Sequence, residues 1–351
     1  MALIVASIAI VVGVILSAIG LHLIGGGNAP AAPATAVVLS QRDVLQPLAV
    51  TDTPAAPASP TSAPSPSAPA ASPTARVTPS PVAPALPGGT IVFTSENPVD
   101  RSLYAISPTG QNLRRLAAGD AHNPSCSPDG ETVAFESSRA GGNFVYVQRL
   151  DGAGTPVVVT KGPGSDQLAT WSPDGKTIAF SRAKTNNTAI FTITLASHQE
   201  HQLTSGEGGD WRMSYAPDGR RIVFTSTRTG DNELWLMNAD GTNAHQLTTG
   251  PGDKRDSAWS PDGKWIAFRS DRDGHHWDLY KVSPDNGQIV RLTDDAIDKG
   301  FPNWSPDSRW ILFTAKRGDQ PEVYVMPVDG GDWIPITSPP TIGGGATWCR
   351  A

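Results

Sequence analysis

Side chains able to carry ionic, acid–base or stacking chemistry recur from residue 122 onward at intervals of about 44 residues. This set mixes both signs of charge with aromatic rings. Such a mixture suits a peptide or a sugar better than a phosphate polymer, because a polyanion is bound by uniform positive charge. Alternatively, these side chains only pair with one another and with water. In chain order they are His122, Asp166 with Gln167, Asp210 with Trp211 and Arg212, Lys254 with Arg255 and Asp256, Lys299 with Phe301, and Gly343 to Gly345.

Acids and a histidine in one set would also allow general acid–base catalysis, so an envelope carbohydrate lyase or hydrolase is the alternative to a binding protein. The chain contains no Gly-x-Ser-x-Gly, His-Glu-x-x-His or phosphate-loop motif. Asp271, Asp273 and Gly274 are spaced like the start of a calcium loop, but no glutamate closes it. The sequence therefore predicts no cofactor and no metal site.

The regular spacing of these side chains follows from an internal repeat of the sequence. A Ser-Pro-Asp-Gly turn or a close variant begins at Ser127, Ser172, Ala216, Ser260 and Ser305, and its prolines are 45, 44, 44 and 45 residues apart. A phenylalanine recurs six times downstream of the turn position, and a second aromatic residue follows each one by 11 or 12 residues. Six units of about 44 residues fill the region 89–351.

Each unit contains four short β-type runs separated by turn residues. In one unit the runs are 256–259, 265–268, 278–282 and 289–293, with Pro-Asp-Gly after the first and Asn286-Gly287 before the last. Four strands of about five residues, repeated six times, predict an all-β fold: a six-bladed β-propeller of four-stranded blades.

The two ends of the repeat predict how the ring closes. The first unit begins at Thr90 with what corresponds to a second strand, and the chain ends with residues 346–349, which correspond to a first strand. We predict that this C-terminal strand takes the innermost place in the blade of residues 90–117. The charged, aromatic and glycine residues named above, from His122 to Gly345, precede the innermost strands. They would then surround one mouth of the axial channel.

The two cysteines are predicted to approach each other across one blade interface. Cys126 takes the aromatic position of its first strand, and Cys349 takes the next position of the neighbouring first strand, so their side chains leave opposite faces of the two sheets. An exported protein would oxidise such a pair. Alternatively, Cys126 packs as a small apolar side chain.

The run Trp-Ser-Pro-Asp-Gly-x-x-Ile-Ala-Phe, nearly complete at 171–180 and 259–268, resembles the repeat of the TolB-type propellers, a WD-like family. The resemblance covers residues 89–351, and departures are confined to Cys126, Ala216 and Ser308. It implies a six-bladed propeller of the bacterial envelope, often with protein binding at one end of the ring. The small α/β domain that precedes the propeller in TolB has no counterpart in this chain, so a role in the Tol–Pal system is not implied. Lyases on related propellers use several axial histidines, whereas the predicted mouth has only His122.

The first 27 residues are predicted to be a transmembrane signal anchor. Residues 2–24 carry no charged side chain, and as a helix they would be long enough to cross a hydrocarbon core of ~30 Å. The alternative is a cleaved signal peptide, for which Ala32-Pro33-Ala34 offers a weak cleavage site, but the segment lacks a basic n-region.

Residues 28–88 are predicted to be a disordered linker. They contain 14 prolines and 16 alanines among 61 positions and no aromatic residue, so they cannot bury enough apolar surface to fold. The net charge of −6 argues against a nucleic-acid partner. The sequence thus predicts a membrane-tethered, extracytoplasmic (periplasmic) propeller of the cell envelope that binds an envelope protein, a peptide or a glycan.

Overall fold

The computed structural model describes residues 85–351 except 96, 98, 99, 186, 206, 207, 275 and 339–342. The predicted membrane anchor and all but the last four residues of the predicted linker lie outside the described residues. Within the described part of the chain there is no helix with the length and apolarity needed to span a membrane.

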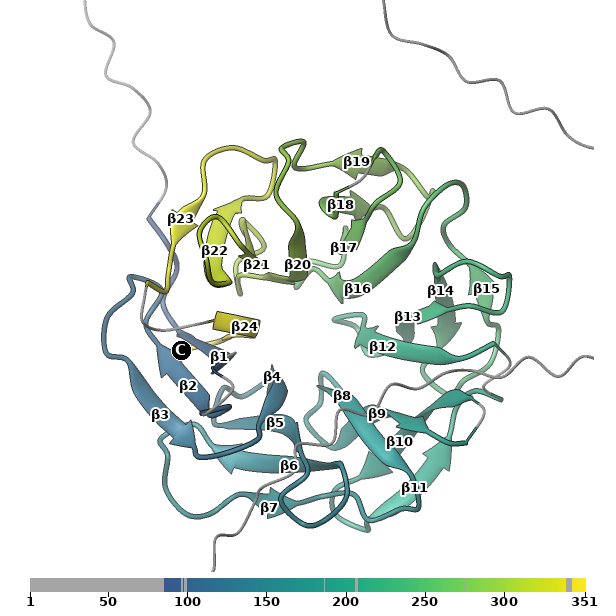
Figure 1. Cartoon of the computed structure of the whole chain (residues 1–351). Coiled ribbons are helices and arrows are strands. Elements are labelled where there is room, and N and C mark those ends of the chain that lie inside the picture. The colour runs from purple at the N-terminus through teal and green to yellow at the C-terminus, as the bar shows by residue number, and fades with distance from the viewer. Residues whose placement is uncertain are drawn as a thin grey trace, which may run out of the picture. The chain divides into compact units, whose positions relative to one another are not determined.

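The described chain folds into six antiparallel sheets of four strands, which stand as blades around a central axis (Figure 1). From the axis outward, blade 1 contains β24 (Gly343–Cys349), β1 (Thr90–Ser95), β2 (Leu103–Ile106) and β3 (Arg114–Ala117). In the same direction, blade 2 contains β4 (His122–Cys126), β5 (Thr132–Ser137), β6 (Phe144–Arg149) and β7 (Val157–Val158). Blade 3 contains β8 (Ser165–Trp171), β9 (Thr177–Ala183), β10 (Thr188–Thr194) and β11 (Gln199–Gln202).

The second half of the ring follows the same order. Blade 4 contains β12 (Asp210–Tyr215), β13 (Arg221–Ser226), β14 (Glu233–Asn238) and β15 (His245–Gln246). Blade 5 contains β16 (Lys254–Trp259), β17 (Ile266–Ser270), β18 (Asp278–Val282) and β19 (Ile289–Arg291). Blade 6 contains β20 (Lys299–Trp304), β21 (Trp310–Ala315), β22 (Glu322–Pro327) and β23 (Ile334–Pro335). The predicted all-β, six-bladed propeller is confirmed.

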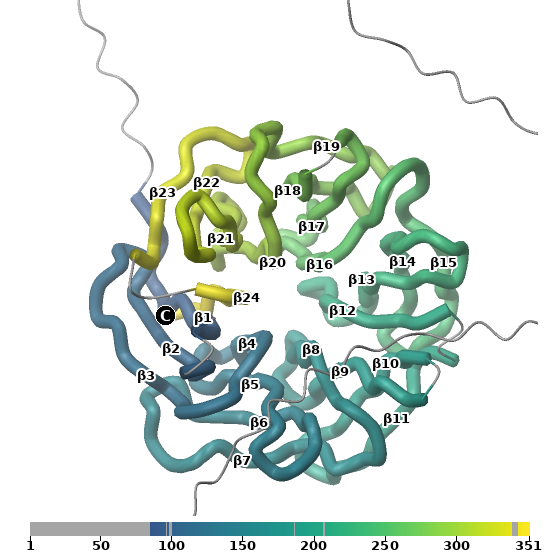
Figure 2. Tube along the Cα trace, viewed as in Figure 1, coloured from purple at the N-terminus to yellow at the C-terminus, as the bar shows by residue number. Residues whose placement is uncertain are grey.

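The ring closes as predicted, with the C-terminal strand innermost in blade 1. Strand β24 pairs with β1, so that Trp348 faces Ile91 and Thr347 faces Val92. Figure 2 shows these two ends of the described chain side by side, β24 in yellow and β1 in blue. Both ends are therefore held in one sheet, and blade 1 can form only when residues from both ends are present.

The recurring aromatic pairs are cross-strand neighbours in the blades. The phenylalanine of each second strand faces the aromatic residue of the third, as in Phe135 opposite Tyr146 and Phe268 opposite Tyr280. The rings of these two pairs stack with centroids 5.9 and 5.5 Å apart. A spacing of 11 or 12 residues is what one antiparallel hairpin requires to bring them together.

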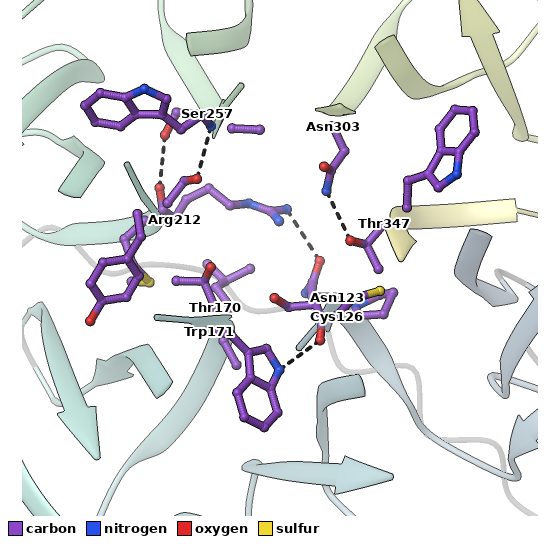
Figure 3. A pocket seen from close by; sticks show the side chains of 18 of the residues that line it. Asn123, Cys126, Thr170, Trp171, Arg212, Ser257, Asn303 and Thr347 are labelled. Atoms are coloured by element: carbon purple, nitrogen blue, oxygen red, sulfur yellow. Dashed lines mark hydrogen bonds between the residues drawn. The ribbon is translucent and has the colours of Figure 1, made fainter. Parts of the chain in front are cut away.

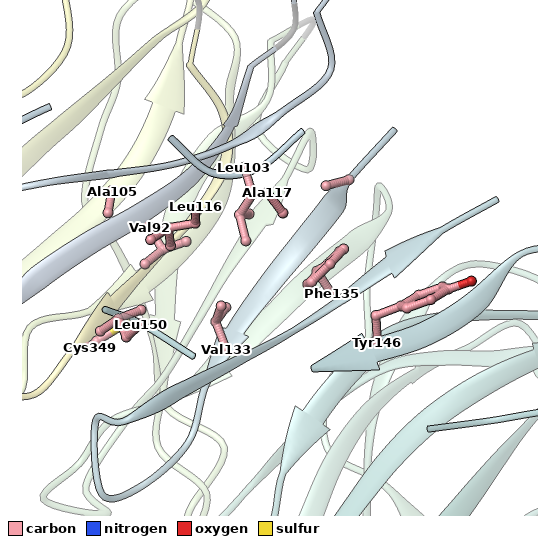
Figure 4. Close-up of a cluster of buried hydrophobic side chains, with 11 residues drawn as sticks. Val92, Leu103, Ala105, Leu116, Ala117, Val133, Phe135, Tyr146, Leu150 and Cys349 are labelled. Atoms are coloured by element: carbon pink, nitrogen blue, oxygen red, sulfur yellow. The ribbon is translucent and has the colours of Figure 1, made fainter. Parts of the chain in front are cut away.

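Neighbouring blades are joined by apolar side chains from both sheets. Between blades 1 and 2, Val92 and Leu103 pack with Val133 and Phe135 (Figure 4). Tryptophans of the innermost strands add polar links: the indole Nε1 of Trp171 donates to the Ser125 carbonyl of the preceding blade at 3.1 Å. Trp304 makes the equivalent bond to the Ala258 carbonyl at 2.9 Å, whereas the Trp259 indole donates to Gly263 of its own turn.

The Asp of each Ser-Pro-Asp-Gly turn has a structural role. The Ser172 hydroxyl donates to the Asp174 carboxylate at 2.6 Å, and the Ser260 hydroxyl donates to Asp262 at 2.7 Å. The bond from Ser172 lowers the pKa of Asp174, so the turn keeps its charge over the ordinary pH range.

A disulfide joins Cys126 on β4 to Cys349 on β24, with their Cα atoms 5.4 Å apart. It links the innermost strands of blades 2 and 1. The C-terminal strand is therefore held by a covalent bond in addition to its pairing with β1.

Iodoacetamide is expected to leave both cysteines unmodified in the denatured, unreduced protein and to modify both after reduction. The physical reason is that a disulfide has no thiolate to react. Intact-protein mass spectrometry, with and without reducing agent, measures the difference. Modification without reduction would contradict an oxidised pair.

Candidate functional site

The innermost strands of all six blades enclose a central cavity of about 370 Å³ (Figure 3). The side chains in Figure 3 converge on it from different blades. Its wall contains polar, aromatic and small apolar side chains. The polar ones include Asn123, Thr170, Arg212, Ser257, Asn303 and Thr347.

Every innermost strand interrupts its pairing at the same place. The register with the second strand shifts between His122 and Ser125, and shifts at the corresponding positions occur in the other blades. Such a β-bulge re-aims one side chain and is common beside functional sites. In blades 2 to 6 the residue at the shift has a positive φ, between 47° and 58°: Asn123, Leu168, Arg212, Asp256 and Phe301.

These five residues, together with Gly345 of blade 1, form what we call the bulge ring. All six line the cavity. A left-handed backbone is uncommon for residues such as Leu168 and Phe301, and strain of this kind concentrates where side chains must be held for binding. The six residue types all differ, although the turns and aromatic positions beside them repeat. The ring is thus the part of the inner wall where the blades are least alike.

Four predicted members of the mouth line the cavity: Arg212, Asp256, Phe301 and Gly345. All four belong to the bulge ring, and the shift of register turns the side chains of Arg212, Asp256 and Phe301 toward the axis. The observed β16 starts at Lys254, two residues before the run predicted from the sequence, because pairing resumes on the far side of this bulge.

Four other predicted members are buried charges with partners instead of open mouth residues. Asp166 accepts two bonds from Arg182, at 2.6 and 2.9 Å, and Asp210 accepts one from Arg228 at 2.8 Å. The Nζ of Lys254 lies 2.8 Å from Glu233 of blade 4, and that of Lys299 lies 2.8 Å from Asp278 of blade 5. They precede the bulge, where the strand still directs side chains into the blade interior or the interface between blades. Their partners are not members of the predicted set, so these four neither line the cavity nor pair with one another across the mouth.

The remaining predicted residues lie outside the cavity wall. The His122 ring lies 3.1 Å from Asp120, whose pKa is lowered to about 2 by hydrogen bonds from Ser138 and from His122 itself. Gln167 donates to Ser165 at 2.9 Å, and Trp211 is half-buried. Arg255 pairs with Asp253 at 2.5 Å. In the described part of the chain, no three His, Cys, Asp or Glu side chains are grouped so as to hold a metal ion.

Several cavity residues were missed from the sequence: Asn123, Leu168, Thr170, Asn303 and Thr347. A usable signal existed for the first two, because positions 123, 168, 212, 256 and 301 recur with the period of the repeat and differ in residue type. The conformation that turns them toward the axis has a weaker signal, since none of the five is glycine and only Asn123 and Asp256 are of types enriched in the left-handed region.

A polar network crosses the cavity between blades. Arg212 Nε lies 2.8 Å from Asp256 Oδ1, and Arg269 Nε lies 2.6 Å from Asp256 Oδ2. The far end of Arg212 reaches across the axis and donates to Asn123 Oδ1 at 3.4 Å (Figure 3). Burial lowers the pKa of Arg269, and the positive charges of Arg212 and Arg255 add to this effect, whereas Asp256 opposes it.

The fold and the site together define a closed six-bladed propeller with a polar axial cavity. The family model of the TolB beta propeller domain matches residues 71–211, 124–251, 213–295 and 257–347, which together span well over half of the chain. The chain therefore belongs to the TolB beta propeller domain family. No curated protein matches it.

Solved structures show the same fold. TolB from Acinetobacter baumannii superimposes with a TM-score of 0.68 at 23% identity, over 74% of this chain and 66% of that one, just under two thirds of its length. A putative TolB from Agrobacterium tumefaciens gives 0.59 at 23% identity, over 72% of this chain and 90% of that one. A chain in the crystal structure of a nidogen/laminin complex gives 0.61 at 12% identity, over 75% and 99%. At these identities the likeness shows the fold alone.

Proposed function

We propose that the protein is a binding module of the cell envelope, and that its axial cavity holds a segment of a partner protein or peptide. The observation that carries the proposal is the bulge ring. Six inner strands repeat one sequence pattern yet present six different side chains to one cavity. A ring needed only for closure would have no reason to hold leucine, arginine and phenylalanine in left-handed backbone conformations.

The cavity suits a peptide segment in size and chemistry. Its volume of about 370 Å³ lies at the lower end of the range of ligand pockets, enough for a few side chains. Amide and hydroxyl groups of Asn123, Asn303 and Thr347 can bond to peptide groups, while Phe301 and Trp171 offer apolar contacts. Membership of the TolB propeller family supports a protein as the partner.

The tether is part of the same proposal. Residues 2–24 would anchor the chain in the membrane, and residues 28–88 would hold the propeller on the extracytoplasmic side. The disulfide between Cys126 and Cys349 supports an oxidising compartment. Tethering raises the local concentration of the propeller near other envelope proteins, so a modest affinity would be sufficient.

Filling the cavity is expected to abolish partner binding without unfolding the ring. Thr170 lies on β8 and lines the cavity, and Thr170→Trp adds a large side chain there. We expect at least a tenfold loss in the amount of partner captured from an envelope extract by the full chain in mild detergent, because the segment can no longer enter. A tenfold loss corresponds to about 1.4 kcal/mol of binding free energy.

The matched control is Thr194→Trp, which places the same side chain at an exposed position on β10 of the same blade. Capture is quantified by mass spectrometry of the eluted proteins, and the melting temperature of each variant is measured in parallel. Equal recovery of the same partners by both folded variants would refute the cavity as the binding site.

A further inference from the structure

Three arginines and two aromatic rings alternate from the cavity outward, and we call them the arginine ladder. Its members come from β12, β20, β17, the segment before β18, and β16, and so from blades 4, 6 and 5. Successive guanidinium-to-ring distances are 4.8, 5.5, 4.6 and 5.4 Å. In order, the ladder consists of Arg212, Phe301, Arg269, Trp277 and Arg255.

The three positive charges of the arginine ladder are in direct contact with fewer negative charges. Two carboxylates touch its three guanidinium groups: Asp256, which lies between Arg212 and Arg269, and Asp253, which pairs with Arg255. Asp298 acts on Arg269 from further away, is largely exposed and accepts a bond from the Trp277 amide at 2.9 Å. Direct contacts thus leave one positive charge without a partner.

Donor groups also remain available on Arg212, which lines the cavity, and on Arg269, which stacks on Phe301 of the cavity wall. The Nε atoms of Arg212 and Arg269 lie 2.8 and 2.6 Å from the two carboxylate oxygens of Asp256. The terminal nitrogens of Arg269 make no hydrogen bond to any residue that the structure describes, and those of Arg212 make only the long bond to Asn123. Position 300 is glycine, and a Cβ there would come within 3.5 Å of Arg269 Nη1. A larger side chain would cover this donor.

We propose that Arg212 and Arg269 bind a carboxylate of the partner segment, so that the cavity recognises an acidic peptide; this inference rests on the proposed binding function. The planar guanidinium fork matches a carboxylate in two parallel hydrogen bonds. Both side chains already lie at ion-pair distance from the carboxylate of Asp256, and neither guanidinium fork donates a hydrogen bond to it among the described residues. Stacking against Phe301 holds them in place before the ligand arrives, which reduces the entropy lost on binding.

A monoanion fits the charge balance better than a phosphate dianion. One unpaired positive charge neutralises one carboxylate, whereas a phosphorylated residue brings a charge of about −2 at neutral pH. A second negative charge would lie close to Asp256 without a compensating cation. The ladder is therefore expected to prefer carboxylates over phosphates.

The test uses the full chain and an immobilised library of random decapeptides. One part carries all its carboxylates free, and a second part is identical but methyl-esterified. A third part has amidated C-termini with free Asp and Glu, a fourth has free C-termini without Asp or Glu, and a fifth carries phosphoserine in place of Asp and Glu. We expect esterification to lower the amount of protein bound to the peptides about tenfold. The third and fourth parts then show whether the carboxylate is a side chain or a C-terminus.

Protein variants separate this inference from the proposed function. Arg269→Gln removes the fork and Arg212→Lys keeps the charge but loses the planar geometry; each is expected to reduce binding to free-carboxylate peptides about tenfold. Arg149→Gln, at an exposed arginine on β6 of blade 2, is the control and should bind as wild type.

Equal binding to esterified peptides, or stronger binding to phosphopeptides, would overturn the carboxylate proposal, as would wild-type binding by both folded ladder variants. Thr170→Trp distinguishes failure of the carboxylate proposal from failure of the proposed binding function. If it blocks binding while esterification does not, the cavity is the site and the carboxylate proposal alone fails. Loss of binding in Arg269→Gln with an unchanged melting temperature, together with loss on esterification, supports it.

Discussion

Deletion of residues 343–351 is expected to prevent formation of the monomeric propeller. The deletion removes the whole of β24, the innermost strand of blade 1, and with it the buried side chains of Ala346, Trp348 and Cys349. Trp348 packs with Ile91 of blade 1 and with residues of blade 6. Loss of one buried tryptophan costs about 3–5 kcal/mol, and loss of a disulfide that closes a long loop costs several more. The sum is comparable with the entire stability of a domain, about 5–15 kcal/mol.

The truncated chain should also associate, because β1 would become an unpaired edge that can pair with another molecule. Size-exclusion chromatography and thermal unfolding measure both effects. The control lacks only Ala351, an exposed residue beyond the last strand. A chain without residues 343–351 that elutes as a monomer with an unchanged melting temperature would contradict closure through β24.

The architecture could be predicted from the sequence because its determinants are local and repeated. Each Ser-Pro-Asp-Gly turn is held by its own serine and aspartate, and each Phe–aromatic pair is set by one hairpin. Six copies give the number of blades. The phase of the pattern at Thr90 and at Trp348 gives the closing strand, since a second strand without a first needs a partner from elsewhere.

The site could be predicted only in part, because a single backbone feature decides which side chains face the axis. Strict alternation along β16 would place residues 254 and 256 on the same face. The shift of register between Arg255 and Ala258 breaks the alternation, so Asp256 lines the cavity while Lys254 is fully buried. Residue type gives only a weak sign of such a bulge, since none of the five left-handed positions is glycine and only Asn123 and Asp256 are of types enriched there.

Lys254 therefore allows a direct test of whether a predicted mouth lysine binds a ligand or stabilises the interface between blades. Its ammonium group lies between blades 4 and 5, 2.8 Å from Glu233 Oε1, and it also donates to the carbonyls of Gly250 and Gly252. The second Glu233 oxygen accepts a bond from Thr248. Both charged side chains are almost completely buried, so neither can regain solvent when the other is removed.

Lys254→Met is expected to destabilise the protein by about 3–5 kcal/mol, because it leaves the Glu233 carboxylate buried without a cation. Chemical denaturation measures the free energy of unfolding. Lys264→Met, at an exposed lysine of the same blade, should change it by less than about 0.5 kcal/mol.

Adding Glu233→Gln to Lys254→Met should recover about half of the loss in the free energy of unfolding or more, since it removes the buried charge and leaves the carbonyls of Gly250 and Gly252 as the main unpaired groups. If Lys254 instead served a ligand at the mouth, Lys254→Met would keep its stability and lose partner binding, and Glu233→Gln would rescue nothing. The recovery in the double variant is thus the result that assigns Lys254 to the interface between blades.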